Sequence, residues 1–582
     1  MFLATTALTE FWDKDRELLY LGMWCLPREK MAQWTGARGK IMESPWNESG
    51  RSDLLTRQCA EDVPERLVDF LGAALNDMLG ISRSPKYWRI LLRPWALAHV
   101  AVVADHWLHL DAAFRHNPGL ETMGLDPQDF IVPRNTNDHH YRLLKDSYHL
   151  QLYSEIMTAM GRQFPVARLP AGEEKDLMPR PQRGVKGALR EVVLGAARGL
   201  RSWEFSKAYF GGLGLEGKDG WSLVKNSKGK LWPVGEQLPA NLNFAPEPAR
   251  RARLSNFPAH GEVEKLIART LPTHFPTLFL EGYHRWREHV LSRWPRAPQR
   301  LLVGRGLLHD EYLKMLVAEG VERNGRVAVC QDDGDGLQAP TTGEKHERSV
   351  ADQYWTWGWT EEASAGARLK PMPDPRRVSS PAPRGAGAQE TLLLGTSLPR
   401  YPYSAGFDRM PLWHRFYDYL KQRERFVGLL PQWVRDAMSL QINAPDFGWG
   451  HKERMKARFP GVRFEGKPWQ ERLDGFKLVV IDHPLQSPLQ ALSSNVPTLL
   501  FWDPNLWPSR PAAKPALEAL RVGGMLHDTV EAAAAQAAWI LKDPMKWWRS
   551  ENVQQSRAEF CKIYAKSDPN WAKLWIKAAQ EI

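Results

Sequence analysis

Residues 477–501, KLVVIDHPLQSPLQALSSNVPTLLF, decide the fold class of this chain. The run 477–481 is short and apolar, and the run 497–501 repeats that pattern after a helical stretch over 488–494. Two buried strands that are joined by a helix form a βαβ unit, in which the strands are parallel and the helix covers the sheet. The segment therefore predicts an α/β domain that is built on a parallel sheet.

The same alternation of apolar strands and helical stretches continues on both sides of this unit. Repeated βα units produce a parallel sheet with helices on both faces. We therefore predict a doubly wound, Rossmann-like second domain over 391–582 that ends in a helical segment. Its further strands are expected at 391–394 and 439–442, and its further helices at 408–428, 451–459, 515–522, 530–541, 545–565 and 570–582.

A first α/β domain, also doubly wound, is predicted over 1–369. Between 162 and 275 the apolar periodicity weakens while Pro, Gly and basic residues accumulate, which indicates a basic, helical insertion. The stretch 370–387, KPMPDPRRVSSPAPRGAG, has the composition of an exposed linker, so we place the domain boundary at 370–390. Strands are expected at 2–8, 18–21, 277–280, 301–303 and 327–329, and helices at 63–79, 86–107, 141–161 and 309–319.

Length and charge narrow the class of protein. The chain has 582 residues, and single cores stop growing at roughly 250–300 residues, so two large domains are expected. Its 78 Lys and Arg against 67 Asp and Glu give a net charge of +11, which favours phosphates, acidic sugars or a membrane surface as partners. Many surplus cations lie between 180 and 253, on either a solvated helix face or an anion-facing surface. No nucleic-acid-binding motif accompanies them, so we exclude nucleic acid as a partner.

Cysteine usage and the apolar stretches indicate a compartment. None of the cysteines has the paired spacing of a zinc or redox motif, which fits a reducing cytoplasm. The N-terminus lacks the pattern of a signal peptide, and the apolar stretch 95–110 carries an aspartate and three histidines that would be costly in a bilayer. We expect a cytoplasmic protein and leave peripheral contact with the inner membrane open. The cysteines are Cys25, Cys59, Cys330 and Cys561.

Polar and aromatic side chains follow the strands of the predicted second domain. In an open parallel sheet, ligands bind outside the carboxyl ends of the strands, near the switch in strand order. Ser487 with Pro488 can begin a helix whose amides face an anion, and the nearby tryptophans and Arg510 can stack on a ring and pair with phosphate. A well-capped helix and core tryptophans are the structural alternatives. The candidate donor-binding residues are Gly448, Trp449, His483, Ser487, Trp502, Asn505 and Arg510.

Carboxylates and a histidine follow the predicted strand 327–329 of the first domain. Such groups at the end of a strand can perform acid/base chemistry, and they can equally be polar surface residues. The acidic loop 332–335 lacks the full pattern of a calcium-binding loop, so we reject calcium as its ligand. The candidate catalytic residues are Asp333, His346 and Glu347.

Several longer motifs occur in a specific order along almost the whole chain. They are FLATTALTEFWD from Phe2, LLYLGMWC to Cys25, HERSVADQYWTWGW to Trp359, PRY from Pro399, DFGW from Asp446, NVPTLLFWDPNLWPSR to Arg510, HDT from His527 and WWRSENVQQSRAEFCKIYA to Ala565. In these motifs the chain resembles bacterial surface-polysaccharide transferases of capsule and lipopolysaccharide pathways. The resemblance is weakest over 162–275.

This resemblance implies a GT-B glycosyltransferase, in which the C-terminal domain holds a nucleotide sugar and the N-terminal domain holds the acceptor. The expected reaction moves a sugar, for instance from a CMP-linked ulosonic acid, to a cell-surface or lipid-linked glycan. Such an enzyme works without a bound metal when protein cations and amides neutralise the donor phosphates, so on this resemblance we predict neither a metal nor a cofactor. The resemblance implies a donor side with Gly448, Trp449, Ser487, Asn505 and Arg510, and an interdomain cleft with Thr5, Thr6, Gln331, His346 and Glu347.

Two loops depart from the pattern of the relatives. Where they carry Gln-His-Gly-Gly, this chain has the run 331–334, QDDG, which lacks the histidine. Where they carry Thr-Thr-x-Leu-Glu, this chain ends the run 487–490 in Gln490, an amide in place of a carboxylate. A catalytically degenerate protein that acts in glycan assembly or binding is therefore the alternative function.

Overall fold

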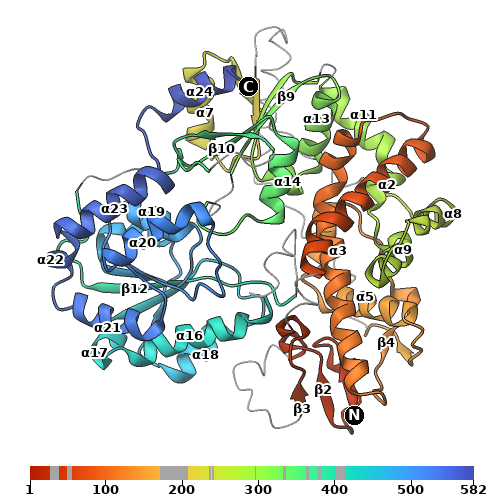
Figure 1. The fold of residues 1–582 in the computed structure, drawn as a ribbon, viewed down its shortest axis with the longest axis horizontal. Coiled ribbons are helices and arrows are strands. Elements are labelled where there is room, and N and C mark those ends of the chain that lie inside the picture. The colour runs from red at the N-terminus through yellow and green to blue at the C-terminus, as the bar shows by residue number, and fades with distance from the viewer. Residues whose placement is uncertain are drawn as a thin grey trace.

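The computed structural model describes residues 1–26, 39–48, 55–170, 208–215, 217–234, 238, 242–294, 297–331, 336–361, 366–377, 382–401 and 413–582. Two six-stranded sheets form separate α/β bodies, and a layer of helices that includes α2, α3, α5 and α9 lies along one side of them (Figure 1). The predicted α/β class with two doubly wound domains is confirmed.

The second sheet has the order β14-β13-β12-β15-β16-β17, and every neighbouring pair is parallel. Numbered from its first strand, this is the order 3-2-1-4-5-6 of a dinucleotide-binding domain, which reverses direction between β12 and β15. The strands are β12 (Glu390–Gly395), β13 (Met438–Ile442), β14 (Arg463–Phe464), β15 (Phe476–Ile481), β16 (Thr498–Phe501) and β17 (Leu526–His527).

Helices cover both faces of the second sheet. On one face α16 packs on α21, and on the other α19 and α20 pack on α23 (Figure 1). The predicted long helix 545–565 is two helices, because Ser550 interrupts it as an N-cap in extended conformation. The helices are α16 (Phe416–Leu429), α18 (His451–Arg458), α19 (Gln486–Ser493), α20 (Lys514–Val522), α21 (Val530–Ile540), α22 (Pro544–Trp548) and α23 (Glu551–Tyr564).

The first sheet is also parallel, with the order β11-β10-β9-β8-β6-β7 and a switch point between β6 and β8. Strands β6 and β7 lie inside 162–275, so the prediction of a helical insertion there is wrong in part; residues 171–207 of that range lie outside the described residues. The strands are β6 (Ala208–Gly211), β7 (Leu231–Pro233), β8 (Arg300–Val303), β9 (Arg326–Cys330), β10 (Gln353–Thr356) and β11 (Arg368–Pro371).

The first part of the predicted linker at 370–390 is buried and packed, not exposed. Asp374 and Arg377 are buried and form an ion pair of 3.1 Å just after β11. Helix α24 (Trp571–Gln580) returns to the first body, where the Trp575 indole donates to the carbonyl oxygen of Pro373 and contacts Trp355 edge-on at 5.4 Å. A domain of 391–582 would require this C-terminal helix to pack on the second sheet. The helix packs on the first body instead.

A long helix organises the remaining N-terminal structure. Helix α3 (Pro85–His116, 32 residues) packs on α2, α5, α9, α13 and α14. Residues 277–280 are the helix α10 and not the predicted strand, because a short buried apolar run fits either conformation. The elements beside α3 are β1 (Phe2–Ala4), β2 (Leu18–Tyr20), β3 (Gly39–Ile41), α2 (Val63–Leu79), α5 (Asp146–Ala159), α9 (Glu262–His274), α13 (Glu311–Val321) and α14 (Thr342–Val350).

Among the described residues, no helix has both the length and the hydropathy that a bilayer crossing requires.

Candidate functional site

The carboxyl ends of β12 and β15, at the switch point of the second sheet, hold a buried polar network. The Arg423 guanidinium of α16 donates from Nε to Asp482 Oδ2 at 2.6 Å and from Nη2 to the carbonyl oxygen of Thr396 at 3.0 Å. A buried charge is tolerated only when it is paired and hydrogen-bonded. The network therefore fixes the two chain segments that leave the sheet where a doubly wound domain binds its ligand.

Two titratable groups of this network have shifted pKa values. Burial alone would raise the pKa of the Asp482 carboxyl, but the Arg423 charge beside it lowers that pKa below its usual value. Burial lowers the pKa of His451 to about 3, so this imidazole is neutral near pH 7. His451 Nε2 lies 2.8 Å from Ser397 Oγ, directly after β12. The sequence analysis missed Arg423, Ser397 and His451, because only the fold brings them together.

The switch point of the first sheet is different, because backbone fills it. Gly212 has φ +63°, and a Cβ atom there would lie 2.9 Å from the Cα atom of Gly306. A Cβ atom at Gly304 would lie 2.7 Å from the carbonyl oxygen of Gly212. The loops after β6 and β8 thus meet backbone to backbone, whereas the second sheet presents polar side chains at the equivalent place.

Next to this glycine contact, Asp310 caps helix α13 by accepting hydrogen bonds from the amides of Tyr312 at 2.9 Å and Leu313 at 3.2 Å. Burial raises the pKa of Asp310 to about 6, above the ordinary carboxyl value. The folded state therefore binds more protons than the unfolded state between about pH 4 and pH 6, and stability falls as the pH rises through this window.

An Asp310→Asn variant should keep the cap and lose this pH dependence, since Asn caps helices as well as Asp does. Between about pH 4 and pH 8, the difference in the free energy of unfolding between variant and wild type should shift in favour of the variant by up to about 2 kcal/mol. Urea unfolding followed by tryptophan fluorescence across this range measures the effect. A difference that does not change with pH would show that Asp310 ionises normally.

The predicted helix start at Ser487 is wrong by two residues. Helix α19 begins at Gln486, so Ser487 lies inside its first turn and accepts a hydrogen bond from Asn443 Nδ2 at 3.0 Å. Leu485, the residue directly before the helix, has no polar atom in its side chain with which to cap the first amides of α19. His483 is buried, and its Nδ1 atom lies 3.1 Å from Asp482 Oδ1. Ser487 and His483 thus belong to the same edge as the Arg423 network, and their roles in donor binding stay predictions.

The glycine loop around Gly448 already surrounds an anion, the carboxylate of Asp446. The amides of Gly448, Gly450 and His451 donate to its two oxygens at 2.9–3.1 Å. Trp449 is buried, and its indole donates to the carbonyl oxygen of Leu398 at 2.7 Å. A carboxylate of the chain itself uses the amides of this loop, and donor binding by Gly448 and Trp449 stays a prediction.

Arg510 is buried between the two bodies, where both terminal nitrogens of its guanidinium pair with carboxylates. Its guanidinium lies 2.5 Å from Glu344 and 2.7 Å from Glu361 of the first body, and 4.2 Å from the centre of the Trp359 ring. Trp502 is buried in the core, as the structural alternative expected, while the neighbouring Asn505 is exposed. The phosphate contact of Arg510 stays a prediction, and in this structure its charge already has two partners.

Two of the three candidate catalytic residues of the first domain, His346 and Glu347, lie in the core. His346 on α14 is fully buried, burial lowers its pKa well below the usual value, and neither ring nitrogen has a hydrogen-bond partner among the described residues. Glu347 is buried beside it, and Asp333 lies outside the described residues. Gln331 accepts hydrogen bonds from Trp357 and Trp359, which makes it a packing residue. The acid/base roles of this group stay predictions.

Thr5 and Thr6 lie where the N-terminal segment meets the second body. The Trp24 indole donates to the carbonyl oxygen of Thr5 at 3.2 Å, and the amide that follows Thr6 donates to Asp146. Asp146 also accepts from the hydroxyl of Tyr401 at 2.5 Å, in the segment that leaves β12. The interdomain location of both threonines and their contact with a ligand stay predictions.

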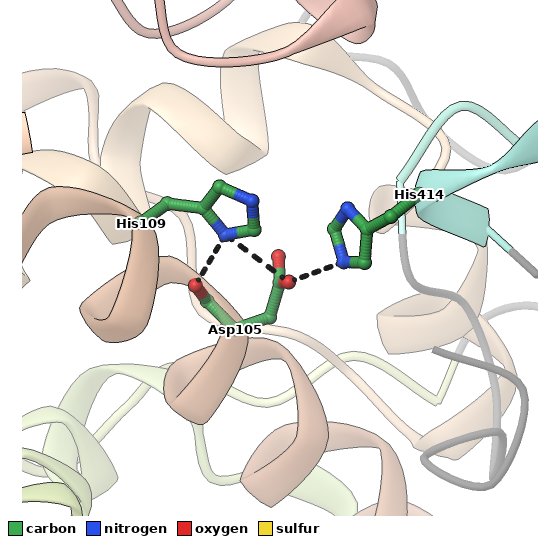
Figure 2. A group of neighbouring side chains, drawn as sticks. All are labelled: Asp105, His109 and His414. Atoms are coloured by element: carbon green, nitrogen blue, oxygen red, sulfur yellow. Dashed lines mark hydrogen bonds and ion pairs between the residues drawn. The ribbon is translucent and has the colours of Figure 1, made fainter. Parts of the chain in front are cut away.

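A cluster that the sequence analysis did not single out joins the helical layer to the second body. We call Asp105, His109 and His414 the junction cluster (Figure 2). His414 Nε2 lies 2.9 Å from Asp105 Oδ1, although 309 positions separate the two residues in the chain. Burial alone would raise the pKa of Asp105, but His109 and His414 hold it well below its usual range. The i,i+4 spacing of Asp105 and His109 was visible in the sequence, whereas His414 belonged to no pattern.

A cavity of about 290 Å³ lies elsewhere, between α5 and α9 of the helical layer. Its lining includes Glu155, Arg162, Arg269 and Thr270, and none of the predicted site residues. The cavity therefore does not mark the site that the two switch points define.

Two doubly wound sheets in one chain, with a C-terminal helix that returns to the first body, define a GT-B-type α/β protein. The chain belongs to the LIC12162 family transferases, because that family matches residues 1–578. The prediction that this protein is a transferase is thereby confirmed. No curated protein is similar enough to the chain to count as a match.

Solved structures of glycosyltransferases match this chain at low similarity. An α,α-trehalose-phosphate synthase (UDP-forming) from Burkholderia vietnamiensis has 10% identity and a TM-score of 0.35, covering 65% of this chain and 98% of its own. An O-GlcNAc transferase mutant from Thermobaculum terrenum has 11% identity and a TM-score of 0.32, covering 92% and 100%. MurG from Acinetobacter baumannii has 10% identity and a TM-score of 0.30, covering 64% and 99%. At these scores the likeness carries no argument about what this chain binds.

Proposed function

We propose that this transferase moves a sugar from a nucleotide-activated donor to a glycan acceptor. The observation that carries the proposal is the polar switch point of the second sheet, where Arg423, Asp482 and Ser397 gather at the carboxyl ends of β12 and β15. Doubly wound domains with this strand order bind nucleotides at that place. The first sheet fills its own switch point with backbone, which favours the second sheet as the donor side.

The chemistry of the edge suits a diphosphate or monophosphate nucleotide. Helix α19 begins there, after a residue that cannot cap it, so its first amides are available to an anion. Fixed donors that face a leaving phosphate stabilise the charge that develops when the sugar departs. Amides and protein cations can do this without a divalent ion at the donor, so the transfer step is proposed to need none.

The donor and the acceptor are narrower parts of the proposal. CMP-linked ulosonic acids are the first donors to screen, followed by GDP- and UDP-sugars, and a surface or lipid-linked glycan is the acceptor. The net charge of +11 suits anionic substrates of this kind and a peripheral contact with an anionic membrane. The acceptor is proposed to bind to the N-terminal half, where Thr5, Thr6 and Asp146 meet the segment that leaves β12.

Substitution of exposed polar residues at this edge should weaken nucleotide binding without unfolding the protein. Asn505 is exposed at the end of β16, so its change to Ala should alter stability by no more than about 0.5 kcal/mol. Asn443 is exposed at the end of β13 but also donates to Ser487, so its change to Ala should cost up to about 1.5 kcal/mol. Each hydrogen bond lost to the nucleotide should weaken binding by about 5- to 10-fold. Titration calorimetry with CMP, GDP and UDP and their sugars measures this.

Asn552→Ala is the matched control. Asn552 is exposed on α23 and contacts the last residue of α20, just before β17, so it lies at the amino ends of the strands, opposite the proposed site. This variant should bind nucleotides like the wild type. If no nucleotide or nucleotide sugar binds the wild-type protein, or if all three variants bind equally, the donor site is not at this edge.

One observation favours the alternative of a protein that binds or assembles glycans without turnover. Asp446 occupies the amides of the Gly448 loop, and Glu344 and Glu361 occupy Arg510, so two predicted phosphate contacts are already satisfied within the chain. Release of free nucleotide from a bound nucleotide sugar distinguishes the functions. A transferase releases it when the acceptor is added, whereas a binding protein retains intact donor.

A further inference from the structure

The junction cluster combines three side chains of metal-binding type from two distant parts of the chain. Asp105 and His109 are four residues apart on α3, which places them on one face of the helix, and His414 lies two residues before α16. Their candidate ligand atoms all lie within 4.8 Å of one another. Figure 2 shows the two imidazole rings on opposite sides of the carboxylate.

His109 has a buried nitrogen that the protein leaves without a partner. Its Nδ1 atom lies 2.9 Å from the carbonyl oxygen of Asp105, and because a carbonyl only accepts, Nδ1 carries the hydrogen. Nε2 is then the ring nitrogen that can bind a metal. This atom is buried and has no hydrogen-bond partner among the described residues. A metal-binding histidine typically donates its other nitrogen to a carbonyl group in this way.

Asp105 is oriented by groups that do not belong to the cluster. The Trp46 indole donates to Asp105 Oδ1 at 2.8 Å, and His106 Nδ1 lies 3.3 Å from Asp105 Oδ2. Trp24 contacts His109 edge-on at 5.0 Å and covers the cluster with an apolar ring. These contacts fix the carboxylate and exclude water, as the groups around a metal ligand do.

We propose that the junction cluster binds one divalent transition-metal ion of the zinc type, with Asp105, His109 and His414 as its ligands. Two imidazoles and one carboxylate select such an ion over Mg²⁺ or Ca²⁺, which prefer oxygen ligands alone. Three protein ligands leave the fourth tetrahedral position open. Because α3 and the segment before α16 both supply ligands, the ion joins the N-terminal helical layer to the second body.

This ion has no part in the proposed transfer step, which is assigned to backbone amides and protein cations at the donor phosphates. The sequence-based expectation of no metal rested on the family resemblance, the acidic loop 332–335 and the scattered cysteines, and none of these arguments concerns the junction cluster. Zinc binding should also stabilise the folded chain, because an ion that binds only the native state raises the free energy of unfolding.

The test uses the full chain after it has been stripped with a chelator. Zn²⁺ is titrated in competition with a chromogenic chelator, and bound metal is counted by elemental analysis. We expect one equivalent per chain in the wild type and a loss of affinity of more than about 100-fold in His109→Ala and in His414→Ala. His116→Ala, an exposed position at the end of α3, is the matched control and should retain the site.

A second measurement does not depend on the folding of a variant. Co²⁺ added to the stripped wild type should give the visible absorption of a low-coordinate nitrogen and oxygen site, and one equivalent of Zn²⁺ should abolish it. The proposal is overturned if the wild type binds no stoichiometric metal, or if His109→Ala binds Zn²⁺ as tightly as the wild type. Nucleotide binding is measured separately, so failure of the donor site and failure of the metal site remain distinguishable.

Discussion

Replacing Arg510 with alanine is expected to lower the free energy of unfolding by about 3–5 kcal/mol, because it leaves two carboxylates facing each other at a buried contact. Arg510 and Glu344 are each 1% exposed, and Glu361 is 16% exposed. Arg348 also contacts both carboxylates and limits the loss, but it cannot neutralise the two charges alone. The contact joins the first and second bodies, so the loss should also uncouple their unfolding.

Chemical unfolding monitored by tryptophan fluorescence and by circular dichroism measures both effects. The wild type should give one transition, and Arg510→Ala should give an earlier and broader one. Arg521→Ala is the matched control, because Arg521 pairs with Asp528 and Glu518 at the surface. Its cost should not exceed about 1 kcal/mol. Equal costs for the two variants would contradict the structural role of Arg510.

The second large effect is expected at the buried pair of the second switch point. Arg423→Met should lower the free energy of unfolding by about 3–5 kcal/mol, because Asp482 then stays buried without its main counter-charge. The variant should also lose nucleotide affinity by at least about 10-fold, since the guanidinium holds the carbonyl oxygen of Thr396 in place. Unfolding experiments and calorimetry measure the two effects on the same protein.

A double variant separates stability from binding. Replacing both partners of a buried pair by apolar groups is often neutral, so Arg423→Met with Asp482→Leu should recover more than half of the lost stability. Nucleotide binding should stay lost, because the polar network is gone. Arg458→Met, which changes an exposed arginine on α18, is the control. If the double variant recovers nucleotide binding as well, the network only supports the fold.

The sequence predicts the central strands of both sheets because buried parallel strands have a pattern of their own, and it misses the outer strands β6, β7, β10, β11, β14 and β17. The strands at 301–303, 391–394 and 477–481 and the helix at 63–79 occur where their periodicity places them. The run 277–280 fails because four apolar residues fit a helix as well as a strand. The return of α24 to the first body depends on contacts such as that of Trp575 with Pro373, which no local pattern encodes.

The site was harder to predict because composition does not report what a side chain already contacts. Arg510 and the Gly448 loop have the residue types of a phosphate site, but carboxylates of the same chain occupy both. His346 follows a strand in sequence and is nevertheless a core residue. Conversely, Arg423 and His414 lie in helical or irregular segments without a motif, and only the fold brings them to Asp482 and Asp105.

The central claim is that the second switch point holds the donor nucleotide, and a structure of the protein with a bound nucleotide tests it most directly. We predict density for the nucleotide phosphates at the carboxyl ends of β12 and β15, beside the first turn of α19 and the segment 396–398. Phosphates at the glycine contact of Gly212 and Gly306, or in the cavity between α5 and α9, would contradict the account.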